Sequence, residues 1–145
     1  NCALGLAQLS RLEDMLARRA AVAALYLERL RKIDGLVLPL PVVEGRLSWF
    51  VFVVRLADRY GREDRDRVLQ GLREAGIGCS NYFPPIHMQA FYAERFGYRP
   101  GDFPVTERIA ARTIALPFFN ALTTSQADEV VDCLGRQIRL LKSRR

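Results

Sequence analysis

The chain is poor in the residues that build disulfide frameworks and metal sites. Its 145 residues include only three cysteines, Cys2, Cys79 and Cys133, which are widely spaced and form no CxxC pair. A disulfide scaffold and a zinc site are therefore disfavoured, and a reducing compartment is favoured. We expect a cytoplasmic protein in which each cysteine is a small buried side chain.

Histidine and lysine are nearly absent. His87 is the only histidine and Cys79 is the only soft ligand near it in the sequence, so we expect no metal. Lys32 and Lys142 are the only lysines, and both lie in charged contexts typical of solvated helix ends. A lysine that forms a Schiff base needs a desolvated pocket that lowers its pKa, and neither context predicts one.

Long apolar runs and blocks of like charge are also missing. No stretch approaches the ~18 consecutive apolar residues of a membrane span, and no basic-then-apolar leader precedes the first helical pattern, so we expect no membrane partner. The net charge of +6 could attract a polyanion, but most arginines alternate with acids, as in residues 62–67. Because this alternation is typical of a solvated helix face, nucleic-acid binding is disfavoured as well.

The length and the 50% hydrophobic content predict one domain with a sizeable core. Its elements form an α+β domain, in which a small, mainly antiparallel sheet is covered on one side by helices. The predicted strands cover residues 36–41, 47–56 and 77–82, and residues 114–117 form a short extended segment. The strand over residues 47–56 is predicted to be buried on both faces. The predicted helices cover residues 3–32, 62–75, a turn or two within 88–96, 105–113, and a final helix with a capping box at Thr123 and Gln126 and an apolar stripe at Ala127, Val130, Val131, Leu134, Ile138 and Leu141.

Aromatic residues, prolines and the single histidine concentrate in residues 80–104. Proline donates no backbone hydrogen bond and pushes the preceding residue toward extended geometry, so residues 83–85, Phe-Pro-Pro, predict a stiff corner. His87 follows two residues later on this rigid support. Irregular backbone with large rings and one titratable group favours a ligand-facing loop, although such loops also cover cores.

Three segments carry a resemblance to a known family. Residues 82–87 read YFPPIH and are followed by aromatic pairs, residues 3–9 read ALGLAQL, and residues 104–117 read PVTERIAARTIALP. In this order they resemble the C-terminal part of the DegT/DnrJ/StrS sugar aminotransferases, over nearly the whole chain.

The resemblance implies the small C-terminal domain of a fold-type-I aminotransferase that uses pyridoxal phosphate. Residues 1–33 would be a long connecting helix, and residues 36–145 the small sheet-and-helix domain. The parent protein would convert a nucleotide-linked keto sugar to an amino sugar for polysaccharide or secondary-metabolite synthesis, with an amino acid such as glutamate or glutamine as donor, and would act as a homodimer.

The chain departs from the family in one respect. The family's Schiff-base lysine and most of its cofactor contacts belong to a large domain that would precede Asn1, and no residue here matches them. We therefore expect a fragment that binds no pyridoxal phosphate covalently and does not catalyse alone.

The resemblance places the corner near the mouth of the sugar-nucleotide site, so His87, Tyr82 and Pro85 are the predicted substrate-binding residues. An imidazole can hydrogen-bond a phosphate or carboxylate, or move a proton. The alternative for His87 is a structural hydrogen bond within the loop. Ser48 and Trp49 match the start of a family strand and are better explained as core than as ligand contacts.

Two other classes of function stay open. The chain could be a non-catalytic binding or assembly module that uses its long first helix, because a wide apolar stripe with Leu9, Leu12 and Leu16 needs to be covered. It could also be an independent enzyme with His87 as general base. The only nucleophile-and-histidine arrangement that the sequence suggests is Cys79 with His87, eight residues apart.

Overall fold

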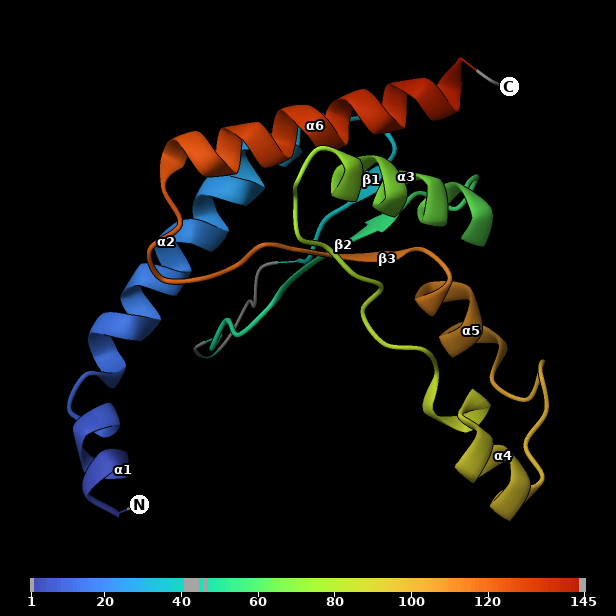
Figure 1. Cartoon of the computed structure of the whole chain (residues 1–145), viewed down its shortest axis with the longest axis horizontal. Coiled ribbons are helices and arrows are strands. Elements are labelled where there is room, and N and C mark those ends of the chain that lie inside the picture. Colours follow the sequence, from blue (N-terminus) through green and yellow to red (C-terminus); the bar gives the residue numbers. More distant parts are fainter. Residues whose placement is uncertain (1, 41–44, 46, 144–145) are drawn as a thin grey trace.

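The computed structural model describes residues 2–40, 45 and 47–143; Pro41, the end of the first predicted strand, lies outside them. Helix α6 lies across α2 and α3 on one side of a small antiparallel sheet, while α4 and α5 extend away as an arm (Figure 1). This arrangement confirms the predicted α+β class. The strands, in the sheet order β1-β2-β3, are β1 (Leu36–Val37), β2 (Phe52–Leu56) and β3 (Thr113–Leu116). The helices are α1 (Cys2–Leu9), α2 (Leu12–Leu30), α3 (Arg62–Glu74), the 3-10 turn η1 (Ile86–Met88), α4 (Ala90–Phe96), α5 (Pro104–Ala110) and α6 (Thr124–Lys142).

Helix α6 contributes one complete face to the hydrophobic core. It begins with the predicted capping box: the Gln126 N–H donates to Thr123 Oγ1 (3.2 Å), and the Thr123 N–H donates to Gln126 Oε1 (3.0 Å). Its core face contacts both α2 and α3. The predicted stripe is buried at every position, Ala127, Val130, Val131, Leu134, Ile138 and Leu141.

Strand β2 is the centre of the sheet and pairs antiparallel with both neighbours, with Val54 opposite Ile114 on β3. Phe52, Val54 and Leu56 are buried, and the residues between them are only partly buried. The prediction of a strand over residues 47–56 with both faces buried is therefore wrong. The sheet is covered on one face, so its central strand follows the two-residue alternation of a half-buried strand.

The helix predicted over residues 3–32 is interrupted between α1 and α2. Ser10 Oγ donates to the Ala7 carbonyl oxygen (2.9 Å), and the Arg11 N–H donates to the Gln8 carbonyl oxygen (3.1 Å). These bonds to residues three positions earlier tighten the chain into a turn. The prediction of one continuous helix is wrong because apolar periodicity continues through a turn that local polar contacts create.

The apolar stripe of the first helix divides at this turn. In α2, Leu30 is fully buried and Leu27 packs against the core. Farther toward the N-terminus, Leu12 is 39% exposed and Leu9 is 64% exposed. The stripe predicted to need a partner is therefore uncovered only in its N-terminal part, and α1 contains no buried residue.

The strand predicted over residues 77–82 is reduced to one bridge, in which Ser80 pairs with Ala115 of β3. The pairing stops because the chain turns away at Phe83, whose φ of 56° is incompatible with an extended strand. In the arm the predicted helical turns are present as η1 and α4. Helix α5 stops at Ala110; of the residues predicted to continue it, Ala111 and Arg112 form a turn and Thr113 begins β3.

We predict that the purified chain self-associates through α1, because Leu4, Leu6 and Leu9 are each more than 60% exposed. Burying one leucine is worth about 1.5–3 kcal/mol, so Leu6→Ser should weaken the association by about tenfold or more. Sedimentation velocity at several concentrations measures it. The matched control is Leu140→Ser, which removes a half-exposed leucine from α6. A monomeric chain at all concentrations would contradict the prediction.

Candidate functional site

The candidate site is built around a rigid corner of the chain at residues 81–85. Phe83 adopts a left-handed backbone conformation, which is uncommon for a residue with a Cβ atom. Its N–H donates to the Asn81 carbonyl oxygen (3.1 Å), and its ring lies 4.6 Å from the ring of Tyr82. Thr113 of β3 donates from Oγ1 to Asn81 Oδ1 (2.9 Å), which ties the corner to the sheet.

His87 lies inside the arm, just after the corner. Its side chain is 8% exposed, and Nε2 is 3.0 Å from Glu107 Oε1 on α5. The imidazole centroid is 4.7 Å from the ring of Phe103. The structural hydrogen bond that the sequence left open is thus present. A direct contact between His87 and a substrate stays a prediction.

Glu107 gathers several donors on one carboxylate. It accepts from the Gly101 N–H (2.9 and 3.1 Å to its two oxygens) and from the Phe103 N–H (3.4 Å), besides its bond to His87. The Gly101 N–H, followed by the His87 side chain, holds the pKa of Glu107 below its usual range. An ionised Glu107 has no proton to donate, so His87 donates from Nε2, and Nδ1 is the ring nitrogen that Glu107 does not engage.

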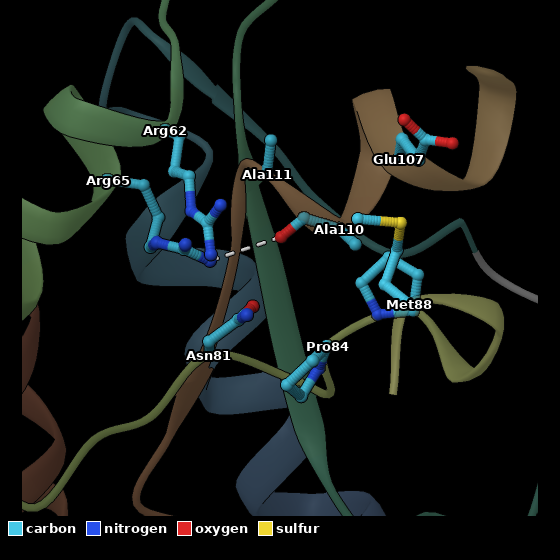
Figure 2. A pocket seen from close by; sticks show the side chains of 9 residues that line it. Arg62, Arg65, Asn81, Pro84, Met88, Glu107, Ala110 and Ala111 are labelled. Carbon is cyan, nitrogen blue, oxygen red and sulfur yellow. Dashed lines mark hydrogen bonds between the residues drawn. The ribbon is translucent and has the colours of Figure 1, made fainter. Parts of the chain in front are cut away.

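A cavity of about 290 Å³ lies between α3, the corner and α5 (Figure 2). We call it the arginine cavity, because Arg62 and Arg65 of α3 line one side of it. The opposite wall is mostly apolar. It includes Pro84, Pro85, Met88, Ala110 and Ala111.

A second depression, the aromatic hollow, lies on the arm and has a volume of about 420 Å³. Its lining consists of Ile86, His87, Tyr92, Phe96, Tyr98, Phe103 and Thr106. The three predicted substrate-binding residues are therefore distributed around the corner. Pro85 lines the arginine cavity, His87 lines the aromatic hollow, and Tyr82 lines neither of the two.

The burial of Arg65 was not predicted from the sequence. Residues 62–67 were predicted to form a solvated helix face, but Arg65 is 2% exposed. Its Nη1 donates to the Ala110 carbonyl oxygen of α5 (3.1 Å), and its Nε donates to Asp66 (2.7 Å). The prediction is wrong at Arg65 because that position lies three residues before Val68, on the face of α3 that packs against the domain. The three-residue spacing was the available signal.

The remaining candidate residues lie elsewhere. Trp49 is partly buried, with its ring 5.6 Å from that of Phe52, and Ser48 is exposed. Cys79 is half-buried, and desolvation raises the pKa of its thiol. The thiol also contacts the Leu69 carbonyl oxygen, so its surroundings are those of an unreactive cysteine. This does not favour an enzyme that uses Cys79 as nucleophile.

The two lysines do not fit a Schiff base with pyridoxal phosphate. Lys142 is half-exposed at the end of α6, where Nζ donates to Asp34 (2.7 Å), and Lys32 is exposed after α2. Neither lies in a desolvated pocket. Within residues 2–40, 45 and 47–143, no cluster of metal-ligating side chains occurs, and none of the helices has the length and apolar character needed to cross a bilayer.

Comparison with known proteins identifies the family. The sequence model of the DegT/DnrJ/EryC1/StrS aminotransferase family matches residues 1–135, and the chain belongs to this family. The resemblance predicted from the three sequence segments is thereby confirmed. Members of the family are sugar aminotransferases that depend on pyridoxal phosphate.

Individual relatives agree with this assignment. The spore coat polysaccharide biosynthesis protein SpsC of Bacillus subtilis is 33% identical over 133 residues, which are 91% of this chain and 34% of SpsC. The crystal structure of S. venezuelae DesV in complex with a ketimine intermediate superposes with a TM-score of 0.81 at 30% identity, covering 92% of this chain and 34% of DesV. TlmJ, an aminotransferase from Streptoalloteichus hindustanus, gives 0.81 at 28% identity, covering 95% and 36%. The chain therefore spans about a third of the length of its relatives.

We predict that acidification releases the arm from Glu107. The pKa of Glu107 is lower in the folded state than its unfolded value of ~4.3, so the hydrogen bonds of Glu107 stabilise the fold at pH values above ~4.3. This stabilisation is lost as the pH falls through the folded-state pKa. Hydrogen-exchange protection of the Gly101 amide measures the loss. In Glu107→Gln the protection should already be low at pH 6. Glu94→Gln, which changes an exposed acid on α4, should behave as the unmodified chain, and equal protection in both variants would refute the prediction.

We also predict that the chain gives no site-selective adduct when incubated with pyridoxal phosphate and reduced with borohydride. The physical reason is that both lysines are solvated, so neither amine lies in the desolvated pocket that favours an aldimine at neutral pH. Peptide mass spectrometry locates the adducts. Lys32→Arg and Lys142→Arg serve as matched controls, and stoichiometric labelling that one of them abolishes would count against this prediction.

Proposed function

We propose that the chain is the C-terminal part of a pyridoxal-phosphate-dependent aminotransferase that converts a nucleotide-linked keto sugar to an amino sugar, with an amino acid as nitrogen donor. The observation that carries the proposal is the family match over residues 1–135. The assignment of SpsC to polysaccharide biosynthesis supports a sugar substrate. Because no lysine here fits a Schiff base, the lysine and the cofactor would belong to the remaining two thirds of a longer protein.

The proposed division of the chain separates its N-terminal helical part from the rest. Residues 1–33 would connect a large domain to the small one, and residues 36–145 would form the small domain. The exposed leucines along α1, such as Leu6, support the proposal that another part of a longer protein packs against this helix. The longer protein would be cytoplasmic and homodimeric, and the chain by itself would not catalyse transamination.

The proposed contacts with the sugar nucleotide come from both sides of the corner. Pro85 would form part of an apolar wall, and the Tyr82 hydroxyl would meet a polar group of the substrate while its ring packs on Phe83. His87 would present Nδ1 to the substrate, because Nε2 is engaged by Glu107. The buried Nε2 bond fixes the orientation of the ring, so the chain's own contribution is to bind and orient the sugar.

A non-catalytic assembly module is the second candidate, and the uncovered α1 surface favours it. The two functions differ in what the complete gene encodes. A product with a large N-terminal domain that contains a buried lysine supports the aminotransferase. A product limited to this chain contradicts it and supports the assembly module.

In the complete gene product, His87→Ala should raise the KM for the nucleotide sugar and leave the half-reaction with the amino donor nearly unchanged. A lost hydrogen bond to a charged group weakens binding by roughly tenfold to a hundredfold. Steady-state and single-turnover kinetics separate the two effects. Glu107→Gln is the control for orientation, because it keeps the imidazole and removes its ionised partner.

If His87 has only a structural role, sugar kinetics should be unchanged in His87→Ala while the melting temperature falls. That outcome would remove His87 from the proposed substrate contacts.

A further inference from the structure

The arginine cavity contains hydrogen-bond donors that the protein leaves without acceptors. The Arg62 side chain forms no ion pair or hydrogen bond with any of the described residues. Arg65 uses Nε for Asp66 and Nη1 for the Ala110 carbonyl oxygen, and within the same part of the chain its Nη2 has no acceptor. The Arg65 side chain is only 3% exposed, so this guanidinium is held in place rather than moving in solvent.

Asn81 adds a third donor from the corner. Its Oδ1 lies 2.9 Å from Thr113 Oγ1, and in this orientation of the amide the Nδ2 hydrogens have no acceptor among the described residues. Figure 2 shows Asn81 directed toward the space into which Arg62 and Arg65 also point. Donors from α3 and from the corner thus converge on one cavity.

The nearby acids do not neutralise this set of donors. Glu107 also lines the cavity, but it is occupied by His87 and Gly101, and in Figure 2 its carboxylate points away from the two guanidinium groups. Asp66 engages Arg65 at Nε only. The guanidinium of Arg62 therefore lines the cavity without an ion-pair partner among the described residues.

We propose that the arginine cavity binds a phosphoryl group. Two guanidinium groups and an amide offer more N–H donors than the two oxygens of a carboxylate accept, whereas a phosphoryl group presents up to three terminal oxygens and a larger negative charge. The cavity volume of about 290 Å³ lies at the low end of the ~300–1,000 Å³ found for ligand pockets, so it takes part of a substrate.

The phosphoryl group has two possible sources, a nucleotide diphosphate or pyridoxal phosphate. The nucleotide source rests on the proposed function, because it would place the diphosphate of the sugar nucleotide beside Pro85. Binding of phosphate itself does not rest on it. The two statements are therefore tested by separate arms of one experiment.

The first arm titrates the 145-residue chain with inorganic phosphate in a calorimeter, with the ionic strength held constant by sodium chloride. Arg62→Gln should weaken binding by about tenfold, because it removes a charged donor from the cavity. Arg67→Gln is the matched control: it removes the same charge from α3, on the side that faces α6, and should change the affinity less than twofold. Arg62→Lys should recover part of the affinity.

Binding that falls equally in Arg62→Gln and Arg67→Gln would overturn the proposal, since it would reflect overall charge. Absence of binding by the unmodified chain would overturn it too. The second arm compares uridine diphosphate with pyridoxal phosphate as competitors. Competition by uridine diphosphate that depends on Arg62 supports the nucleotide source. Competition by pyridoxal phosphate alone supports the phosphoryl site and contradicts the nucleotide assignment.

Discussion

The arm of this domain depends on the carboxylate of Glu107. Helices α4 and α5 contain no buried residue, and the aromatic rings of the arm pack on one another while staying partly exposed. Glu107 binds the backbone of Gly101 and Phe103 on one side and His87 on the other, and it thereby closes the loop between the two helices onto the corner. The Glu107 bonds therefore shape both cavities of the candidate site. They hold the aromatic rings that line the aromatic hollow, and they hold α5 beside the arginine cavity.

A second tie connects the arm to the main body. The buried Arg65 of α3 donates to the Ala110 carbonyl oxygen at the end of α5, where the chain enters β3. This bond satisfies a carbonyl at a helix C-terminus and at the same time brings a guanidinium to the cavity wall. The same residue therefore stabilises the fold and builds the site, while its neighbour Arg62 has no structural bond within the described chain.

The contrast between the core and its extensions explains which parts of the fold the sequence could predict. The α6 stripe and the capping box at Thr123 were predicted correctly, because each depends on spacing along a single helix. The break after α1 and the short pairing of Ser80 were missed, because both depend on local polar bonds and on a corner that redirects the chain. The strand predicted over residues 47–56 contains β2 but begins five residues too early, and the partly exposed face of β2 depends on which elements cover the sheet.

The sequence by itself determined the family, the helix stripes and the rigid Phe-Pro-Pro corner, since these follow from residue order and from the fixed backbone of proline. Only the tertiary structure decided how the predicted site residues are distributed. Pro85 faces one cavity and His87 another, and the partner of His87 lies twenty residues later in the chain. Contacts between residues so far apart depend on how the elements fold onto one another, which the spacing of residues along the chain does not encode.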